Sequence, residues 1–172
     1  PSINAFKKLI ENNVKIIFTV DCGTLSFEAI DYAKKMNIDV IVLDHHQSEI
    51  NLPNAYSVIN PNRIDDKSNL QYLCAAGVAF MFLVSINKHL RLNDWFNKNL
   101  IEEPNLINYL DLVSLGTVCD VVPLIGLNRA IVKQGLKILK AKKNLGLKTL
   151  LDICKIEVNP SIYHLGYILG PR

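Results

Sequence analysis

The chain has 172 residues, of which 49% are hydrophobic and 20% are charged, a balance typical of a folded globular domain rather than a disordered segment. Its net charge of +3 is compatible with a polyanionic partner but does not require one. No stretch reaches the roughly 20 apolar residues that a membrane helix needs, so no membrane association is expected. The cysteines lack CxxC spacing, which argues against a zinc knuckle or a disulfide framework and suits the reducing cytoplasm: they are Cys22, Cys74, Cys119 and Cys154.

The first third of the chain predicts two strands that end abruptly at polar residues. An apolar run over residues 15–20 stops at Asp21, and a second run over residues 38–43 stops at Asp44. Unbroken apolar runs of this kind are typical of parallel strands that are covered on both faces. Between the runs, apolar residues recur at helical spacing after Thr24, a candidate N-cap. The order strand, helix, strand predicts a parallel sheet.

The rest of the chain predicts one more strand followed by helices. The third strand is expected over residues 56–59, where Asn60-Pro61-Asn62 ends it, and a polar loop over residues 63–71 follows. Helices are expected over residues 5–12, 73–90, 105–115, 128–141 and 147–154. The sequence therefore predicts an α/β fold with a sheet in its first half and a helical second half.

Lysines are concentrated in the last third of the chain, at positions 133, 137, 140, 142, 143 and 148. A cluster of this kind is equally consistent with a surface that contacts a phosphate backbone and with the solvated face of a helix. The sequence alone does not separate these two interpretations, and both remain open at this point.

Two groups of polar residues follow the two predicted strands, namely Asp21 and the sequence Asp44-His45-His46. In parallel sheets, ligands bind at the edge formed by the carboxyl ends of the strands. A carboxylate together with imidazoles suits Mn²⁺ and related divalent metals, and a pair of such metals can promote phosphoester hydrolysis. By itself, however, an aspartate at a strand end is more often a turn or capping residue. Side-chain alternation would also separate the two histidines, so that one of them could be structural.

A third acid, Asp120, lies in the apolar stretch over residues 115–124. If it is buried, it needs a partner such as a metal ion, a helix N-terminus or an arginine, because an unpaired buried charge is costly. Considered by itself, a cap or turn residue before Pro123 is the favoured alternative. Asp111, within the helix that precedes this stretch, is expected to face solvent.

Three segments resemble motifs of the DHH superfamily of phosphoesterases in their order and spacing: Val20-Asp21-Cys22-Gly23, Leu43-Asp44-His45-His46 and the stretch from Gly116 to Leu124. The last of these, GTVCDVVPL, resembles the RecJ branch of the superfamily in particular. Three further segments do so as well: Asn60-Pro61-Asn62-Arg63, the stretch from Ala75 to Ala79, and Leu169-Gly170-Pro171-Arg172. The resemblance extends from Val14 to Arg172 and implies a Rossmann-like DHH domain with a parallel sheet.

The resemblance also implies roles for individual residues. Asp21 corresponds to the carboxylate that bridges two metal ions, and His45 and Asp120 correspond to ligands of one of them. His46 corresponds to a catalytic histidine beside the scissile phosphate, and Asp44 to the acid that orients the histidines. The cofactor implied is Mn²⁺ or Mg²⁺, in a two-metal site of the complete protein. The last residue, Arg172, is expected to contact a substrate phosphate.

The chain departs from the family pattern in two respects. The first motif, Asp-x-Asp on a strand, is expected before Asp21 but does not occur in residues 1–20. A second, substrate-binding domain is expected beyond Arg172. Residues 1–172 are therefore expected to form a partial DHH catalytic domain that has little activity by itself.

The function implied by the resemblance is metal-dependent 5′-to-3′ hydrolysis of single-stranded DNA by an exonuclease in DNA repair and recombination. One alternative is a DHH phosphodiesterase acting on short oligoribonucleotides or cyclic dinucleotides, which the GTVCDVVPL sequence disfavours. Another is a non-catalytic DHH-fold binding module, which the retained acids and histidines disfavour. The sequence does not predict an oligomeric state.

Overall fold

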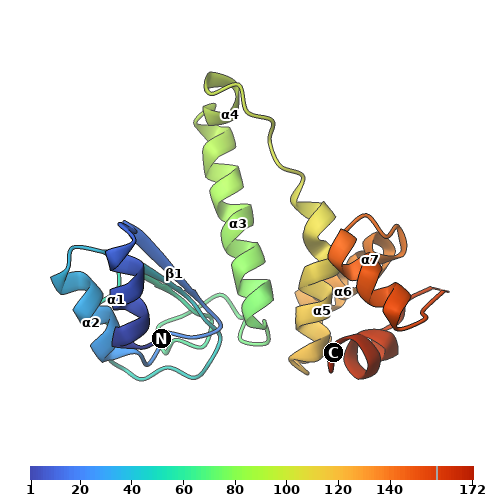
Figure 1. Ribbon diagram of the computed structural model, residues 1–172, viewed down its shortest axis with the longest axis horizontal. Coiled ribbons are helices and arrows are strands. Elements are labelled where there is room, and N and C mark those ends of the chain that lie inside the picture. Colours follow the sequence, from blue (N-terminus) through green and yellow to red (C-terminus); the bar gives the residue numbers. More distant parts are fainter. Residues whose placement is uncertain (158) are drawn as a thin grey trace. The chain divides into compact units, whose positions relative to one another are not determined.

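The computed structural model describes residues 1–157 and 159–172 and divides the chain into two units, Pro1–Ala79 and Phe80–Arg172. The first unit contains a three-stranded sheet in the order β1-β2-β3, in which both pairs of neighbouring strands are parallel (Figure 1). The strands are β1 (Ile16–Val20), β2 (Asp39–Leu43) and β3 (Ser57–Ile59). The predicted parallel sheet is therefore confirmed.

Two helices, α1 (Ile3–Glu11) and α2 (Phe27–Lys35), pack on one face of this sheet (Figure 1). Their buried side chains, including Phe6 and Ile30, form a core with alternate residues of the strands. Burial of these apolar surfaces is the main contribution that holds the helices on the sheet. The strand residues in this core are Ile17, Val40, Val42 and Val58.

The prediction that β1 is covered on both faces is wrong. Its residues alternate between exposed and buried, and the side chains of Ile16, Phe18 and Val20 are 45%, 47% and 49% exposed. The reason is that α1 and α2 both pack on the face that Ile17 occupies. Successive side chains of a strand point to opposite faces, so the apolar residues on the other face of β1 are left uncovered.

The predicted N-cap of α2 is also wrong. The helix begins at Phe27 with Ser26 in the N-cap position, and Thr24 is buried three residues before the helix. The backbone amide of Thr24 donates to the carboxylate of Asp44 at 3.0 Å. Thr24 therefore belongs to the loop that links the ends of β1 and β2.

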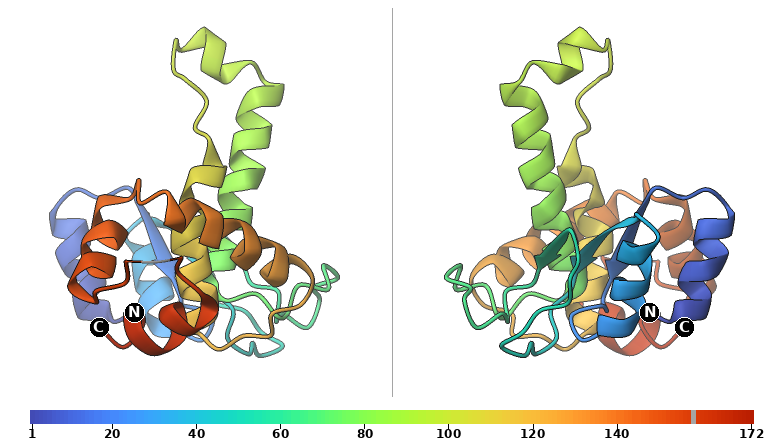
Figure 2. Two further views of the ribbon diagram at one scale, coloured as in Figure 1. Left: turned by 90° about the vertical axis from the view of Figure 1, so that its right-hand side faces the viewer. Right: turned by 90° about the vertical axis from the view of Figure 1, so that its left-hand side faces the viewer.

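The second unit is helical, as predicted. Helix α3 (Ala75–Leu92) begins in the first unit, and Figure 2 shows it running on to α4 before the chain returns to α5. No helix among the described residues is both long and apolar enough to cross a membrane. The other helices are α4 (Trp95–Lys98), η1 (Leu106–Tyr109), α5 (Leu110–Cys119), α6 (Gly126–Lys140), α7 (Leu145–Ile153) and η2 (His164–Leu169).

Helices α5 and α6 pack against each other, and they approach each other closely at Gly135. A Cβ atom at this position would lie 1.8 Å from Ser114 Oγ and 2.1 Å from the carbonyl oxygen of Leu110. Ser114 is fully buried, and its hydroxyl lies 2.6 Å from the carbonyl oxygen of Leu110 and 3.1 Å from that of Ile131. This contact fixes the direction of α5, the helix that ends at Asp120.

The prediction that Asp111, in the first turn of α5, faces solvent is wrong. Its residue surface is 2% exposed, and its Oδ1 accepts a hydrogen bond from the amide of Leu112 at 2.8 Å. A carboxylate near a helix N-terminus is also favoured by the helix dipole. Asp111 is thus a buried acid with a role in the packing of this unit.

Candidate metal centre

The loop after β1 turns sharply at two residues that have positive φ angles. Asp21 has a φ of 62° and Gly23 a φ of 119°. A Cβ atom at Gly23 would lie 2.5 Å from Thr19 Oγ1, so only glycine lets the loop fold back on its own strand. The amide of Asp21 donates to the carbonyl oxygen of Leu43 at 3.0 Å, which places Asp21 beside the end of β2.

The side chains of Asp21, His45 and His46 converge at this edge of the sheet. Asp21 Oδ1 lies 3.2 Å from His45 Nε2, and one potential ligand atom from each of the three residues falls within 4.8 Å of the others. The ring centroids of His45 and His46 are 4.7 Å apart. The two histidines are not separated by alternation, because they follow the end of β2 and lie in a loop.

Asp44 is buried, with 1% of its surface exposed, and its carboxylate accepts several hydrogen bonds. The donors include the amide of Thr24 at 3.0 Å, the amide of His45 at 2.8 Å and the ring of His46 at 2.7 Å. Burial acts to raise the pKa of Asp44, but the hydrogen bonds from His46, Thr24 and His45 outweigh it and hold the pKa well below its usual range.

The contact with ionised Asp44 determines which nitrogen of His46 carries a hydrogen. An ionised carboxylate only accepts hydrogen bonds, so Nδ1 of His46 must carry the hydrogen that points to Asp44 Oδ1. Nε2 is then directed away from Asp44. The side chain of His46 is 58% exposed, which leaves room for a ligand to approach this nitrogen.

Two asparagines that follow β3 hold the backbone of both histidines. Asn60 is buried, and its Nδ2 donates to the carbonyl oxygen of His46 at 2.8 Å and to Thr24 Oγ1 at 2.9 Å. Asn62 donates from Nδ2 to the carbonyl oxygen of His45, and its amide donates to Asn60 Oδ1 at 2.8 Å. The sequence predicted that these residues end the third strand but not that they hold the site, although their position beside the other strand ends was a signal for it.

The geometry of Asp21 and His45 fits a bound divalent cation. Two donors that bind one ion at about 2.1 Å each, at right angles, are about 3.0 Å apart. The distance of 3.2 Å between Asp21 Oδ1 and His45 Nε2 is close to this value. A carboxylate oxygen and an imidazole nitrogen form a ligand pair that suits Mn²⁺ and similar metals.

Asp120 and Arg172, the other predicted site residues, belong to the second unit. Asp120 is exposed and occupies the C-cap position of α5, so the premise of a buried acid in need of a partner does not apply. Arg172 is exposed, and its Nη1 donates to the carbonyl oxygen of Ile168 at 2.9 Å. A shared ion between Asp120 and His45, and a phosphate contact of Arg172, remain predictions.

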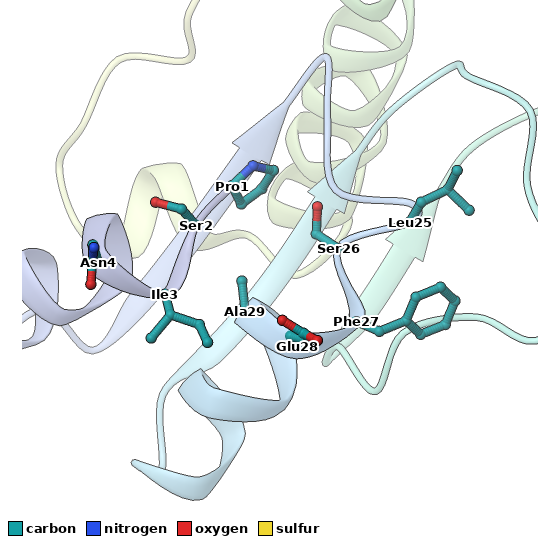
Figure 3. A pocket seen from close by; sticks show the side chains of 9 residues that line it. All are labelled: Pro1, Ser2, Ile3, Asn4, Leu25, Ser26, Phe27, Glu28 and Ala29. Atoms are coloured by element: carbon teal, nitrogen blue, oxygen red, sulfur yellow. The ribbon is translucent and has the colours of Figure 1, made fainter.

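A separate pocket of the first unit lacks a cluster of acids and histidines like that at the strand ends. Its volume is about 860 Å³, and it is lined by residues 1–4 and 25–29, which Figure 3 shows at the beginnings of α1 and α2. Glu28 is the one lining residue with a titratable side chain. The residues at the ends of β1 and β2 are therefore the candidate functional site of this unit.

Comparison with known proteins identifies relatives of this chain. The single-stranded-DNA-specific exonuclease RecJ of Salmonella typhimurium is 42% identical over 160 residues, which cover 92% of this chain and 28% of that protein. The protein of the same name from Bacillus subtilis is 30% identical over 173 residues, which cover 20% of its length. The chain thus spans less than a third of these curated relatives.

Solved structures of RecJ and a model of the DHH family also match this chain. A crystal structure of RecJ from Thermus thermophilus in complex with Mn²⁺ matches 99% of this chain, and 24% of its own chain, with a TM-score of 0.79 and 27% identity. A second structure, of exonuclease RecJ bound to manganese, matches 95% of this chain and 39% of its own with a TM-score of 0.76. The model of the DHH family, N-terminal domain, matches residues 2–117, which is more than half of the chain. The chain therefore belongs to the DHH family.

Proposed function

We propose that this chain is part of a RecJ-type exonuclease that hydrolyses single-stranded DNA in the 5′-to-3′ direction at a two-metal site. The main support is the convergence of Asp21 and His45, 3.2 Å apart, at a strand edge in a member of the DHH family. The names of the relatives support the choice of single-stranded DNA as the substrate. An enzyme of this kind would act in DNA repair and recombination in the cytoplasm.

The proposed roles of the residues are those that the resemblance to the DHH superfamily implies, and the chemistry of the side chains is compatible with them. Asp21, His45 and Asp120 would hold the metal ions, with Asp21 as the ligand common to both. Bound Mn²⁺ or Mg²⁺ supplies an activated water and neutralises charge on the phosphate. His46, oriented by Asp44, contacts the scissile phosphate through Nε2, and Arg172 contacts a neighbouring phosphate.

We further propose that residues 1–172 form part of the catalytic domain and depend on the remainder of the protein for full activity. The share of the relatives that the chain covers, less than a third of their length, supports this division. The remainder would supply the Asp-x-Asp ligands of the second metal and the domain that grips the strand. Residues 1–172 alone are then expected to show little or no nuclease activity.

The test of this function uses the complete protein with DNA labelled at its 5′ end. With Mn²⁺, the protein should release mononucleotides from the 5′ end of single strands, leave duplexes intact, and become inactive in excess chelator. Asp21→Ala should abolish the release, whereas Asp31→Ala, a change of an exposed acid on α2, should retain it. Hydrolysis of cyclic dinucleotides or short oligoribonucleotides in preference to DNA would contradict the proposal.

A further inference from the structure

The excess of positive over negative charge in this chain comes from one short segment. Residues 126–148 contain seven lysines and arginines and no acidic residue. The other 149 residues contain twelve basic and sixteen acidic side chains, so they are negative on balance. The net charge of +3 therefore arises entirely from α6, the beginning of α7 and the segment between them.

Four of these cations lie along one side of α6. At 3.6 residues per turn, positions that are four, eight and eleven residues after the first share one face of a helix. All four side chains are exposed, and the opposite face of the helix is buried against its own unit. We call this set the α6 basic face: it consists of Arg129, Lys133, Lys137 and Lys140.

The α6 basic face extends over about 16 Å, a length over which one strand of a regular nucleic acid presents about five phosphates. None of its four members forms an ion pair within the part of the chain that the structure describes, whereas the nearby Lys142 pairs with Asp152 at 3.1 Å. The cations of this face are thus not neutralised by the fold itself.

The character of the surrounding surface favours a polyanion over other partners. All residues of α6 are described, and none of its large hydrophobic side chains is exposed. A helix that lies on a membrane surface inserts apolar side chains beside its basic ones, and a protein interface has an apolar centre. A helix face with several cations and without exposed apolar side chains of its own fits the regularly spaced phosphates of a nucleic acid, although Ile125 and Leu145 are exposed on either side of α6.

We propose that the α6 basic face binds the phosphate backbone of a nucleic-acid strand, through residues other than those of the candidate metal centre. The identification of the polyanion rests in part on the proposed function, since a nuclease must hold its strand beyond the bond that it cleaves. The contact is electrostatic and independent of base sequence. The structure thereby favours the first of the two interpretations of the lysine cluster.

The test measures binding of residues 1–172 to labelled oligodeoxythymidine of about 20 nucleotides, which is longer than a typical single-strand site. Fluorescence anisotropy in excess EDTA, from about 50 to 200 mM KCl, removes any contribution of metal binding or cleavage. The test variant is Lys133→Gln/Lys137→Gln/Lys140→Gln. Its matched control, Lys8→Gln/Lys15→Gln/Lys35→Gln, removes the same charge from exposed positions of the first unit.

The test variant should bind at least about tenfold more weakly at low salt, with a slope of log K against log salt reduced by about 2, or about 0.7 for each cation. The control should change binding less than about twofold, and circular dichroism should confirm that both variants fold. An equal loss in the control, or an unchanged slope in the test variant, would overturn the proposal. Binding to phosphatidylserine vesicles that is lost in the test variant, with unchanged DNA binding, would assign the face to membranes instead. Because the assay contains no metal, its result is independent of whether the proposed nuclease activity is found.

Discussion

At the scale of single residues, the arrangement of the site depends on groups that hold Asp44 and the histidines. Asp44 is buried and is kept ionised by hydrogen bonds from Thr24, His45 and His46. Since its pKa is lower in the folded chain than in the unfolded chain, Asp44 stabilises the fold above the unfolded-state pKa. This contribution is lost as the pH falls towards the folded-state pKa.

Asn60 connects to the same network through the hydroxyl of Thr24 and the carbonyl oxygen of His46. We expect Asn60→Ala to weaken Mn²⁺ binding by about tenfold, the lower end of effects seen when groups behind metal ligands are removed. Asn60→Asp should weaken it as well, because it keeps the acceptor for Asn62 but loses both donated hydrogen bonds. Isothermal titration calorimetry on folded variants measures the affinity.

The control for this prediction is Asn51→Ala, a change of an exposed residue in the segment between β2 and β3. It should leave Mn²⁺ binding unchanged. If Asn60→Ala binds Mn²⁺ as tightly as the parent while it unfolds at a lower temperature, Asn60 supports only the stability of the fold.

The residues of the site were predictable from the sequence to different degrees. Asp21 and His45 could be paired because the carboxyl ends of parallel strands meet at one edge of the sheet. The contacts of Asn60 and Asn62 could not be predicted. A hydrogen bond from a side chain to a backbone carbonyl depends on the conformation of two loops that are distant in sequence. The exposure of Asp120 was not predictable either, since apolar neighbours in sequence do not bury a residue at a helix end.

At the scale of elements, apolar patterning predicted the strands of the parallel sheet and the longer helices, but not the shortest helices. The strands and the helices α3, α5, α6 and α7 were found close to their expected positions. The four residues of α4 are too few for a helical period, and the wider turn of the π-helix η2 differs from the expected period of 3.6. The prediction that β1 is covered on both faces failed because the apolar composition of a strand does not show how many faces of its sheet are covered.

The contact between α5 and α6 gives a prediction at this scale. Gly135→Ala should destabilise the chain by about 1–3 kcal/mol, because the new methyl group would overlap with Ser114 and the backbone of Leu110. Urea denaturation followed by circular dichroism measures the change. Gly146→Ala in α7 is the matched control, since its nearest neighbour would be Asn144 Oδ1 at 3.4 Å.

The control should be neutral or stabilising by up to about 1 kcal/mol, because alanine restricts the unfolded chain without strain in the helix. Equal stabilities for Gly135→Ala and Gly146→Ala would show that the helices adjust at Gly135 without cost. The close approach would then not be what fixes the direction of α5.

At the scale of the whole molecule, the chain combines a sheet-bearing unit that carries Asp21, Asp44, His45 and His46 with a helical unit that carries the α6 basic face. The chain belongs to the DHH family and is similar to proteins named as the single-stranded-DNA-specific exonuclease RecJ. The account depends most on one claim, that Asp21 and His45 bind a divalent metal ion.

Calorimetric titration of residues 1–172 with Mn²⁺ tests this claim most directly. The parent chain and Asp31→Ala should bind Mn²⁺ with similar affinity, because Asp31 is an exposed acid on α2 outside the site. Asp21→Ala and His45→Ala should each bind at least about tenfold more weakly, since each removes a direct ligand. Binding by Asp21→Ala that equals binding by the parent chain would contradict the metal centre, and the likeness to the DHH family would then be one of fold alone.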